Sequence, residues 1–210
     1  MIGILKKKSE KAVLTIIGGS LKGEKIVLDT EPDVRPTRQQ VREAVFQIWA
    51  ELIQGAVFLD PFAGSGAIVI EALSRGVEEI YASDTRADRL FELRKKLKSL
   101  ERKRPGLVEP SRIVLSSADF REAIGEHFAC RRKFDLIYLD PPYQSGMGIE
   151  AIRLIARYEL LNPDGQVMLE VSKRELASIE RFLDEDIVFL MKKYHYGETF
   201  LFNMCINEDF

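Results

Sequence analysis

Cysteine and histidine are scarce in this chain of 210 residues, which contains two of each. Cys130, Cys205, His127 and His195 show none of the spacings that are typical of zinc ligands. Two cysteines so far apart in the chain also do not suggest the disulfide framework of a small secreted protein. The sequence therefore predicts no metal site and no disulfide.

Long apolar runs are also missing. No run approaches the roughly 20 apolar residues that cross a bilayer, and the lysines at 6–8 follow a very short apolar start, unlike a secretory signal. We therefore expect a cytoplasmic protein with no membrane contact. Its 46% hydrophobic content is enough for one substantial core. We expect a monomer with one main domain, residues 35–210, preceded by a basic segment and β-hairpin, residues 1–34.

An excess of positive charge is absent as well. Lys and Arg number 31, Asp and Glu 33, and the net charge of −2 argues against a protein that coats nucleic acid. The first forty-odd residues are nevertheless strongly cationic, although surface cations are often merely solvated or paired with nearby acids. A nucleic acid is expected to contact this part, and the candidate residues are Lys22, Arg35, Thr37, Arg38 and Arg42.

The order of apolar patterns predicts the fold. Residues 12–28 contain two β-branched runs separated by glycines, which indicates a hairpin. A helix is expected over about 38–53 with Thr37 as its N-cap, because its apolar positions recur every three to four residues. Strands and helices then alternate, which predicts a doubly wound, seven-stranded Rossmann-like α/β sheet with an antiparallel last strand. The expected strands lie near 56–60, 79–84, 112–116, 134–139, 165–171, 187–191 and 199–204, and the expected helices near 66–75, 86–101, 119–127, 147–159 and 173–183.

A glycine-containing loop, Asp60-Pro61-Phe62-Ala63-Gly64-Ser65-Gly66, follows the first strand of this alternation. Gly64 and Gly66 allow a ligand to approach the backbone, and the helix that follows begins with N–H groups that favour an anion. The loop alone is equally consistent with an ordinary turn, because Val69 stands where the dinucleotide fingerprint has its third glycine. Asp84 ends the next strand, at the spacing of about twenty residues expected of a carboxylate that binds a ribose.

A second motif, Asp140-Pro141-Pro142-Tyr143, follows the strand expected over 134–139. Ligands of doubly wound sheets bind at the carboxyl ends of the strands, where the strand order reverses. If the first and fourth strands are neighbours there, this motif faces the glycine loop. Asp119, after the third strand, is placed either to accept a hydrogen bond from an adenine amino group or to cap the next helix.

Together these two motifs resemble those of S-adenosylmethionine-dependent methyltransferases that modify exocyclic amino nitrogens. Two further stretches, 16–23 and 35–46, narrow the resemblance to the RsmD family, methyltransferases that act on guanine N2 of small-subunit (16S) ribosomal RNA, and it covers nearly the whole chain. The resemblance implies S-adenosylmethionine as cofactor and ribosomal RNA or the small-subunit particle as partner. It implies Asp140, Pro141, Pro142 and Tyr143 as catalytic residues, and Asp60, Phe62, Ala63, Gly64, Ser65, Gly66, Asp84, Thr85, Ala118, Asp119 and Phe120 as cofactor-binding residues.

Several alternatives remain open at this stage. The family often has Glu-x-Asp after the second strand where this chain has Ser83-Asp84-Thr85, so the residue that holds the ribose is undecided. The Asp-Pro-Pro-Tyr motif also serves adenine-N6 methylation of RNA or DNA. A noncatalytic RNA-binding assembly factor on the same scaffold is a third possibility. Methylation of a protein glutamine is disfavoured because such enzymes usually carry Asn at the position of Asp140, and a dehydrogenase is disfavoured by the missing third glycine.

Overall fold

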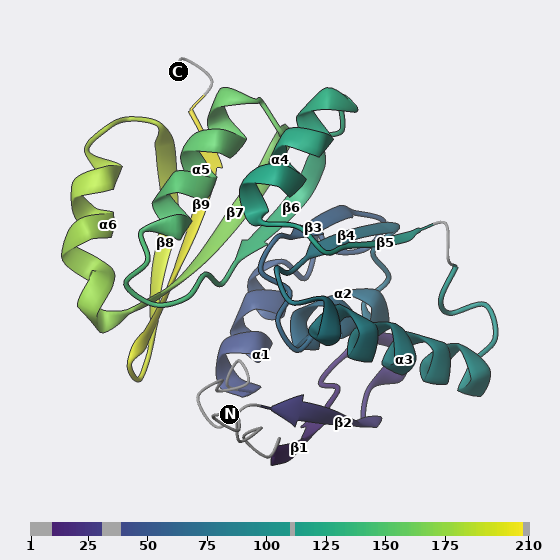
Figure 1. Ribbon diagram of the computed structural model, residues 1–210. Coiled ribbons are helices and arrows are strands. Elements are labelled where there is room, and N and C mark those ends of the chain that lie inside the picture. Colours follow the sequence, from purple (N-terminus) through teal and green to yellow (C-terminus); the bar gives the residue numbers. More distant parts are fainter. Residues whose placement is uncertain (1–9, 31–38, 110–111, 208–210) are drawn as a thin grey trace, which may run out of the picture.

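The computed structural model describes residues 10–30, 39–109 and 112–207. Its main element is a seven-stranded sheet with the order β5-β4-β3-β6-β7-β9-β8 (Figure 1). Neighbouring strands from β5 to β7 run parallel, whereas β9 is antiparallel to both β7 and β8. The predicted doubly wound sheet is confirmed. The strands are β3 (Val57–Asp60), β4 (Glu79–Ser83), β5 (Ile113–Ser116), β6 (Phe134–Leu139), β7 (Leu161–Ser172), β8 (Val188–Tyr196) and β9 (Thr199–Ile206).

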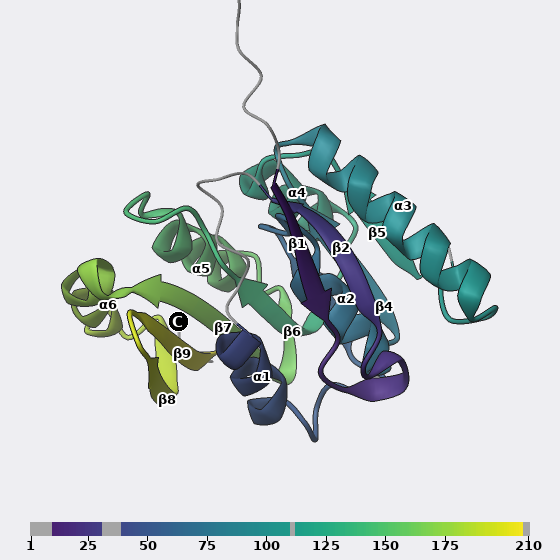
Figure 2. The same cartoon turned by 90° about the horizontal axis from the view of Figure 1, so that it is seen from below.

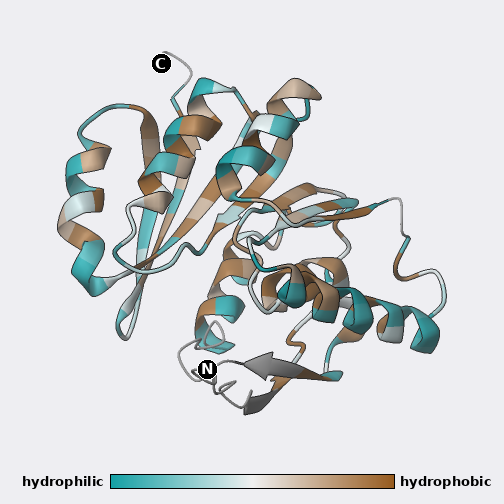
Figure 3. Cartoon of the chain, viewed as in Figure 1, coloured by the Kyte–Doolittle hydropathy of each residue, from teal (hydrophilic) through white to brown (hydrophobic). Residues whose placement is uncertain are grey.

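Helices cover both faces of this sheet, because successive strand residues point to opposite sides. Phe58 and Leu59 of β3, for example, belong to two different buried clusters. Apolar residues accordingly concentrate in the sheet and on the inner sides of the helices, with hydrophilic residues outside (Figure 3). The first cluster includes residues of α1 (Gln39–Ile48), α2 (Ala67–Ser74) and α3 (Ala87–Lys103). The second cluster includes residues of α4 (Phe120–Ala129), α5 (Met147–Arg157) and α6 (Leu176–Leu183). A short 3-10 turn, η2 (Lys173–Glu175), precedes α6.

Three boundaries differ from the prediction by four residues or more. The helix expected to reach residue 53 ends at Ile48, and the turns that follow it bury Trp49 and Ile53 but leave Leu52 exposed. Apolar spacing alone could not reveal this end, since a turn buries such residues as a helix does. Strand β8 continues to Tyr196 and needs only a tight turn before β9, and β7 begins at Leu161, ahead of an irregularity in its pairing with β6.

The N-terminal hairpin forms its own two-stranded sheet, as predicted. Strands β1 (Glu10–Thr15) and β2 (Lys25–Thr30) pair antiparallel, and the 3-10 turn η1 (Gly19–Leu21) between them packs on α2 (Figure 2). A Cβ on Gly19 would lie 1.8 Å from the Ser74 carbonyl oxygen, so only glycine allows this approach. The Leu21 N–H donates to Ser74 Oγ at 2.9 Å, which joins the hairpin to α2.

A buried carboxylate completes this junction. Glu71 of α2 is fully buried, and its two oxygens accept the N–H groups of Ile17 and Gly18 at 3.0 and 2.9 Å. Arg75 donates to Glu71 at 3.1 Å, and Arg42 Nε lies 3.6 Å from it. Two cations thus compensate one buried anion, which is the arrangement that makes a buried charge tolerable.

Arg42 therefore has a structural role in place of the predicted RNA contact. Its side chain is only 2% exposed, and its Nη2 donates to the Thr15 carbonyl oxygen at 2.9 Å. A phosphate of a bound RNA could reach this guanidinium only if α1 separated from the hairpin. The prediction failed because a cationic stretch of sequence does not show which of its cations face solvent.

We predict that Glu71→Ala lowers the free energy of unfolding by about 3–5 kcal/mol, because it leaves Arg75 and two backbone N–H groups without their acceptor and the buried Arg42 without its counter-ion. Urea unfolding followed by circular dichroism measures the change. Glu126→Ala, on the exposed side of α4, is the matched control and should change the value by only about 0.5 kcal/mol. Equal stability of the two variants would contradict the role given to Glu71.

Candidate active site

The two predicted motifs lie at the same edge of the sheet. Strands β3 and β6 are parallel neighbours, with Leu59 paired to Ile137, so Asp60 ends β3 beside the point where Asp140 follows β6. The strand order reverses between these two strands, as expected of a ligand site in a doubly wound sheet. Asp84 lies at the end of β4, on the other side of β3.

The glycine loop is tied down by its own backbone and by β4. The Ala63 N–H donates to the Ser83 carbonyl at 2.9 Å, and both loop glycines have positive φ. A Cβ on Gly66 would meet Leu93 of α3 at 2.4 Å, so this glycine is needed for packing. Gly64 differs, because the nearest atom to a Cβ there is the Phe62 carbonyl oxygen at 3.7 Å. The loop backbone is therefore open to a ligand at Gly64.

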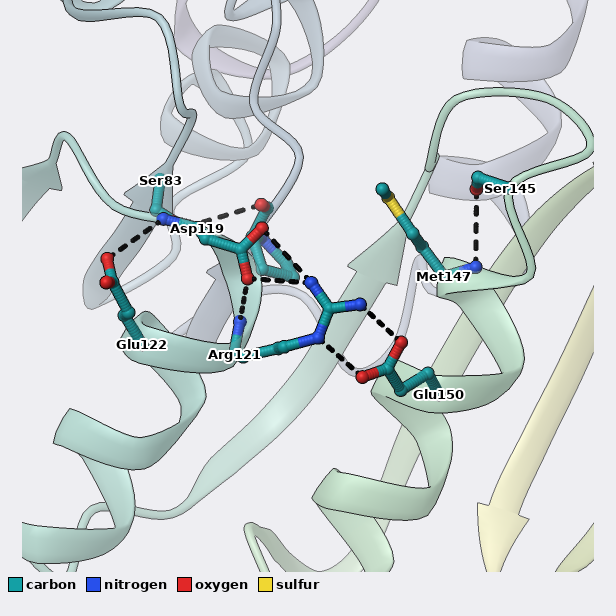
Figure 4. Close-up of polar contacts among 8 residues, drawn as sticks. Ser83, Asp119, Arg121, Glu122, Ser145, Met147 and Glu150 are labelled. Atoms are coloured by element: carbon teal, nitrogen blue, oxygen red, sulfur yellow. Dashed lines mark hydrogen bonds and ion pairs between the residues drawn. The ribbon is translucent and has the colours of Figure 1, made fainter.

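Asp84 holds this loop in place. Its carboxylate accepts the N–H groups of Gly64 and Arg86 at 3.0 and 2.8 Å, and Arg89 Nη1 lies 3.4 Å away. The two residues on either side of Asp84 in the sequence differ in exposure. The Ser83 hydroxyl is buried and donates to the Pro61 carbonyl (Figure 4), whereas Thr85 is exposed. Ser83 is thus engaged within the protein, which leaves Asp84 and Thr85 as the candidates for the ribose.

The start of α4 closes one side of the site. Asp119 is the N-cap of this helix: it accepts the Arg121 N–H at 3.0 Å, while Glu122 accepts the Asp119 N–H at 3.4 Å. The cap interpretation of Asp119 is confirmed, and its contact with adenine stays a prediction. Ala118 and Phe120 are buried, and the Phe120 ring centroid lies 5.1 Å from that of Phe62 in the glycine loop.

An ion pair joins α4 to α5 at this edge. Arg121 Nε and Nη2 donate to the two carboxylate oxygens of Glu150, each at 2.5 Å, and Arg121 Nη1 also contacts Asp119 at 3.1 Å (Figure 4). The pair is bidentate, the geometry that makes an arginine–carboxylate contact most directional. It links the N-cap of α4 to the first turn of α5, just after the Asp-Pro-Pro-Tyr turn.

The Asp-Pro-Pro-Tyr turn is rigidly supported at its base and exposed at its tip. Gly148 of α5 lets the helix approach Pro141, because a Cβ there would lie 3.3 Å from Pro141 Cγ and 2.7 Å from a Leu169 methyl group. Ser145 Oγ donates to the Pro142 carbonyl at 2.6 Å. Tyr143, by contrast, is 58% exposed. The turn therefore has a fixed backbone and presents an aromatic ring at the surface.

Two buried carboxylates, Asp60 and Glu170, and the half-buried Glu175 lie around Asp140. Burial raises the pKa of Asp140 well above its ordinary value, and Glu170, Asp60 and Glu175 add to that rise. Glu170 is 5% exposed and accepts the Tyr138 hydroxyl at 2.5 Å. Burial also raises the pKa of Asp60 to about 7; the Phe62 N–H bond opposes this rise and Asp84 reinforces it.

Sequence reasoning missed some of these supporting residues. Glu170 interrupts the apolar run of β7, and a charge inside a buried strand is a signal that could have identified it. Glu175 accepts the Gln144 N–H at 2.9 Å and so supports the turn from η2. Nothing in the sequence around Glu175 or Gly148 indicates these contacts, since both depend on how separate elements pack.

The predicted RNA-contact residues do not all fall in the described part of the chain. Lys22 is exposed beside the turn between β1 and β2. Arg35, Thr37 and Arg38 lie outside the described residues. Within the described ranges, the structure contains no group of three or more His, Cys, Asp or Glu side chains that could hold a metal, and no helix with the length and apolarity of a membrane span.

We predict a pH-dependent stability difference between the protein and its Asp60→Asn variant. The folded-state pKa of Asp60, about 7, exceeds the ordinary value of about 3.9. Between these values the folded chain therefore binds a proton that the unfolded chain has released. Stability from this group is lost as the pH rises through that window, by at most about 1.4 kcal/mol per unit. Asparagine removes this dependence.

Urea unfolding at pH 4.5 and 7.5 measures this effect. The stability of the protein minus that of Asp60→Asn should fall by about 3 kcal/mol between the two pH values. The exposed Asp184→Asn is the control and should give no such fall. A pH-independent difference for Asp60→Asn would show that Asp60 titrates normally.

Comparisons with known proteins show the family and the fold of the chain. The sequence model of a family described as "Conserved hypothetical protein 95" matches residues 14–204. A Bacillus subtilis protein named "Putative rRNA methyltransferase YlbH" is 32% identical over 188 residues, 89% of this chain and 95% of that protein. The Escherichia coli K12 protein named "Ribosomal RNA small subunit methyltransferase D" is 34% identical over 146 residues, 68% of this chain and 66% of that protein. The solved structure titled "Putative methyltransferase yhhF from Escherichia coli" has a TM-score of 0.72 at 24% identity, covers 93% of this chain and 99% of its own, and shows the same fold.

Proposed function

Because the chain belongs to the RsmD family, the family described as conserved hypothetical protein 95, we propose that it methylates the exocyclic N2 amino group of a guanine in small-subunit (16S) ribosomal RNA, with S-adenosylmethionine as donor. The observation that carries this proposal is the parallel pairing of β3 with β6, which brings the glycine loop and the Asp-Pro-Pro-Tyr turn to one edge. Several relatives are named ribosomal RNA small subunit methyltransferase D, which supports the choice of substrate.

The residues present fit this cofactor. The uncrowded space beside Gly64 lies just before the N-terminus of α2, whose N–H groups suit the carboxylate of an amino acid. Asp84 can accept hydrogen bonds from a ribose at the next strand, and Asp119 and Phe120 lie where an adenine would follow. The cofactor, when bound, supplies a methyl group on a positively charged sulfur. The remaining loop residues, Asp60, Phe62, Ala63, Ser65 and Gly66, would shape its binding site.

The Asp-Pro-Pro-Tyr turn addresses the target amine. The lone pair of a guanine amino group is delocalised into the ring, which makes it a poor nucleophile. If the Asp140 carboxylate and the Pro141 carbonyl accept its two hydrogens, the nitrogen becomes pyramidal and its lone pair is directed toward the donor. The exposed Tyr143 would stack on the base, which commonly contributes about 1–3 kcal/mol.

A base inside a duplex cannot reach this turn. The target must be extruded or already unpaired, and unpairing costs a few kcal/mol that contacts elsewhere on the RNA offset. Lys22, Arg35 and Arg38 are our candidates for such contacts, with Thr37 beside them. Because small subunits are assembled in the cytoplasm, we propose that the enzyme is cytoplasmic. We further propose that it acts as a monomer, either on ribosomal RNA or on the small-subunit particle.

Identification of the methylated base tests this proposal. The protein is incubated with labelled S-adenosylmethionine and undermodified small-subunit RNA, free and in particles, and the product is digested to nucleosides. We predict that the label elutes as N2-methylguanosine. Label in N6-methyladenosine would instead support adenine methylation, and cofactor binding without any transfer would support an assembly factor.

We predict that Asp140→Ala reduces the rate of transfer by about 10²–10³-fold, the effect typical of losing one aligned polar group at the reacting centre. Cofactor affinity, measured by calorimetry, should change little, because this carboxylate faces the amine. Asp184→Ala, at an exposed residue after α6, is the matched control and should keep full activity. An active Asp140→Ala enzyme would overturn the role assigned to Asp140.

A further inference from the structure

Positive charge is concentrated on and around α3. Between Arg86 and Arg104 the chain has nine Lys or Arg residues against three Asp or Glu, although its net charge as a whole is −2. The rest of the protein is therefore distinctly acidic. Such an asymmetry directs a polyanion to one region of the surface.

The outer side of α3 carries an aligned set of exposed side chains. Leu93, Leu97 and Leu100 face the buried cluster. On the opposite side Phe91, Lys95, Lys98 and Arg102 follow one another at intervals of four, three and four residues, which places them on one face of a helix. We call these four residues the α3 line. It spans about 16 Å at 1.5 Å per residue.

The acidic residues of α3 pair with only one cation of this line, Lys95, and Asp88 pairs with Arg86 outside it. Glu101 accepts the N–H groups of Gly106 and Val108 at 2.8 and 2.6 Å, so it is engaged with the following loop. Glu92 pairs with Lys95 at 2.7 Å. Lys98 and Arg102 form no hydrogen bond or ion pair with any other residue in the described part of the chain.

Phe91 adds an aromatic surface to this basic line. Its side chain is 57% exposed, and Lys95 Nζ lies 4.4 Å from the centroid of its ring. A single exposed apolar residue needs no explanation. An exposed ring on the same helix face as the unpaired Lys98 and Arg102, however, is the combination that binds single-stranded nucleic acid, because bases stack on the ring while phosphates contact the cations.

The position of the α3 line connects it to the proposed site. Helix α3 begins three residues after Asp84, whose carboxylate accepts the Arg86 N–H. At its other end Lys103 pairs with Glu24 at 3.4 Å and Arg104 donates to the Ser20 carbonyl. Helix α3 thus runs from the edge of the glycine loop to the hairpin that carries Lys22. Figures 1 and 2 show α3 and the hairpin side by side.

We propose that the α3 line binds the sugar-phosphate backbone of a single-stranded segment of the ribosomal RNA that flanks the target nucleotide. The inference rests on the proposed function for the identity of the RNA. The α3 line is a surface between the proposed site and the hairpin. It would hold the RNA while the target base is extruded. Neither the loop motifs nor the basic N-terminal stretch includes these residues.

Neutralising the two free cations tests this surface. The full-length double variant Lys98→Gln/Arg102→Gln is titrated into a labelled small-subunit RNA fragment by fluorescence anisotropy, over a series of salt concentrations and without cofactor. We predict at least about tenfold weaker binding at 0.1 M salt. The fall of log affinity with log salt should also be less steep by about 1.5, as expected for two lost phosphate contacts. Phe91→Ala should weaken binding with little change in slope.

A second double variant separates contact from overall charge. Arg157→Gln/Lys192→Gln removes the same two charges from exposed residues of α5 and β8, in the other half of the molecule. It should keep the affinity and slope of the unmodified protein. Equal losses in both double variants would overturn the inference in favour of a general charge effect.

Other outcomes are equally distinct. If Lys98→Gln/Arg102→Gln weakens binding to the small-subunit particle but not to naked RNA, the α3 line contacts a ribosomal protein and our inference is wrong. If the unmodified protein does not bind ribosomal RNA at all, both the inference and the proposed function fail. If it binds and methylates RNA and the α3 variant is unchanged in affinity and slope, only the inference fails.

Discussion

The parallel pairing of β3 with β6 is the contact on which the site depends. Its register sets the ends of the two strands side by side, so that two loops about eighty residues apart in the sequence leave the sheet at one edge. The same pairing brings the carboxylates of Asp60 and Asp140 near each other, and reduced contact with water raises the pKa of both. A shift of one residue in this register would direct Asp60 to the opposite face of the sheet.

Keeping buried carboxylates at this edge is costly, and the surrounding structure offsets the cost with specific partners. Tyr138 donates to Glu170, the Phe62 N–H donates to Asp60, and Glu175 binds the backbone of the turn. The junction between α2 and the hairpin solves a similar problem with Glu71 and two arginines. Charged groups with fixed partners are found where the chain must hold loops in position, which is consistent with a site that needs little rearrangement before it reacts.

Much of this architecture could be predicted from local patterns. Alternating apolar runs indicated the sheet, and the position of Asp140 directly after an apolar strand indicated where its carboxylate would emerge. What could not be predicted depends on packing between distant elements. Arg42 looked like a surface cation, yet the contact between α1 and the hairpin buries it; Gly148 looked like an ordinary helix residue, yet it lets α5 approach Pro141. The end of α1 was also missed, because a turn after Ile48 continues the same apolar spacing.

A crystal structure of the protein with S-adenosylhomocysteine, the demethylated form of the proposed cofactor, tests the central claim most directly. The account predicts that its amino-acid part lies against the backbone of Gly64 and that its sulfur faces the Asp140 side of the junction between β3 and β6. A groove of about 710 Å³ elsewhere on the molecule offers an alternative place for a ligand. It is lined in part by Leu161 and Asn162 at the start of β7 and by Phe189 of β8. Cofactor bound in that groove, or anywhere else away from the ends of β3 and β6, would contradict the account.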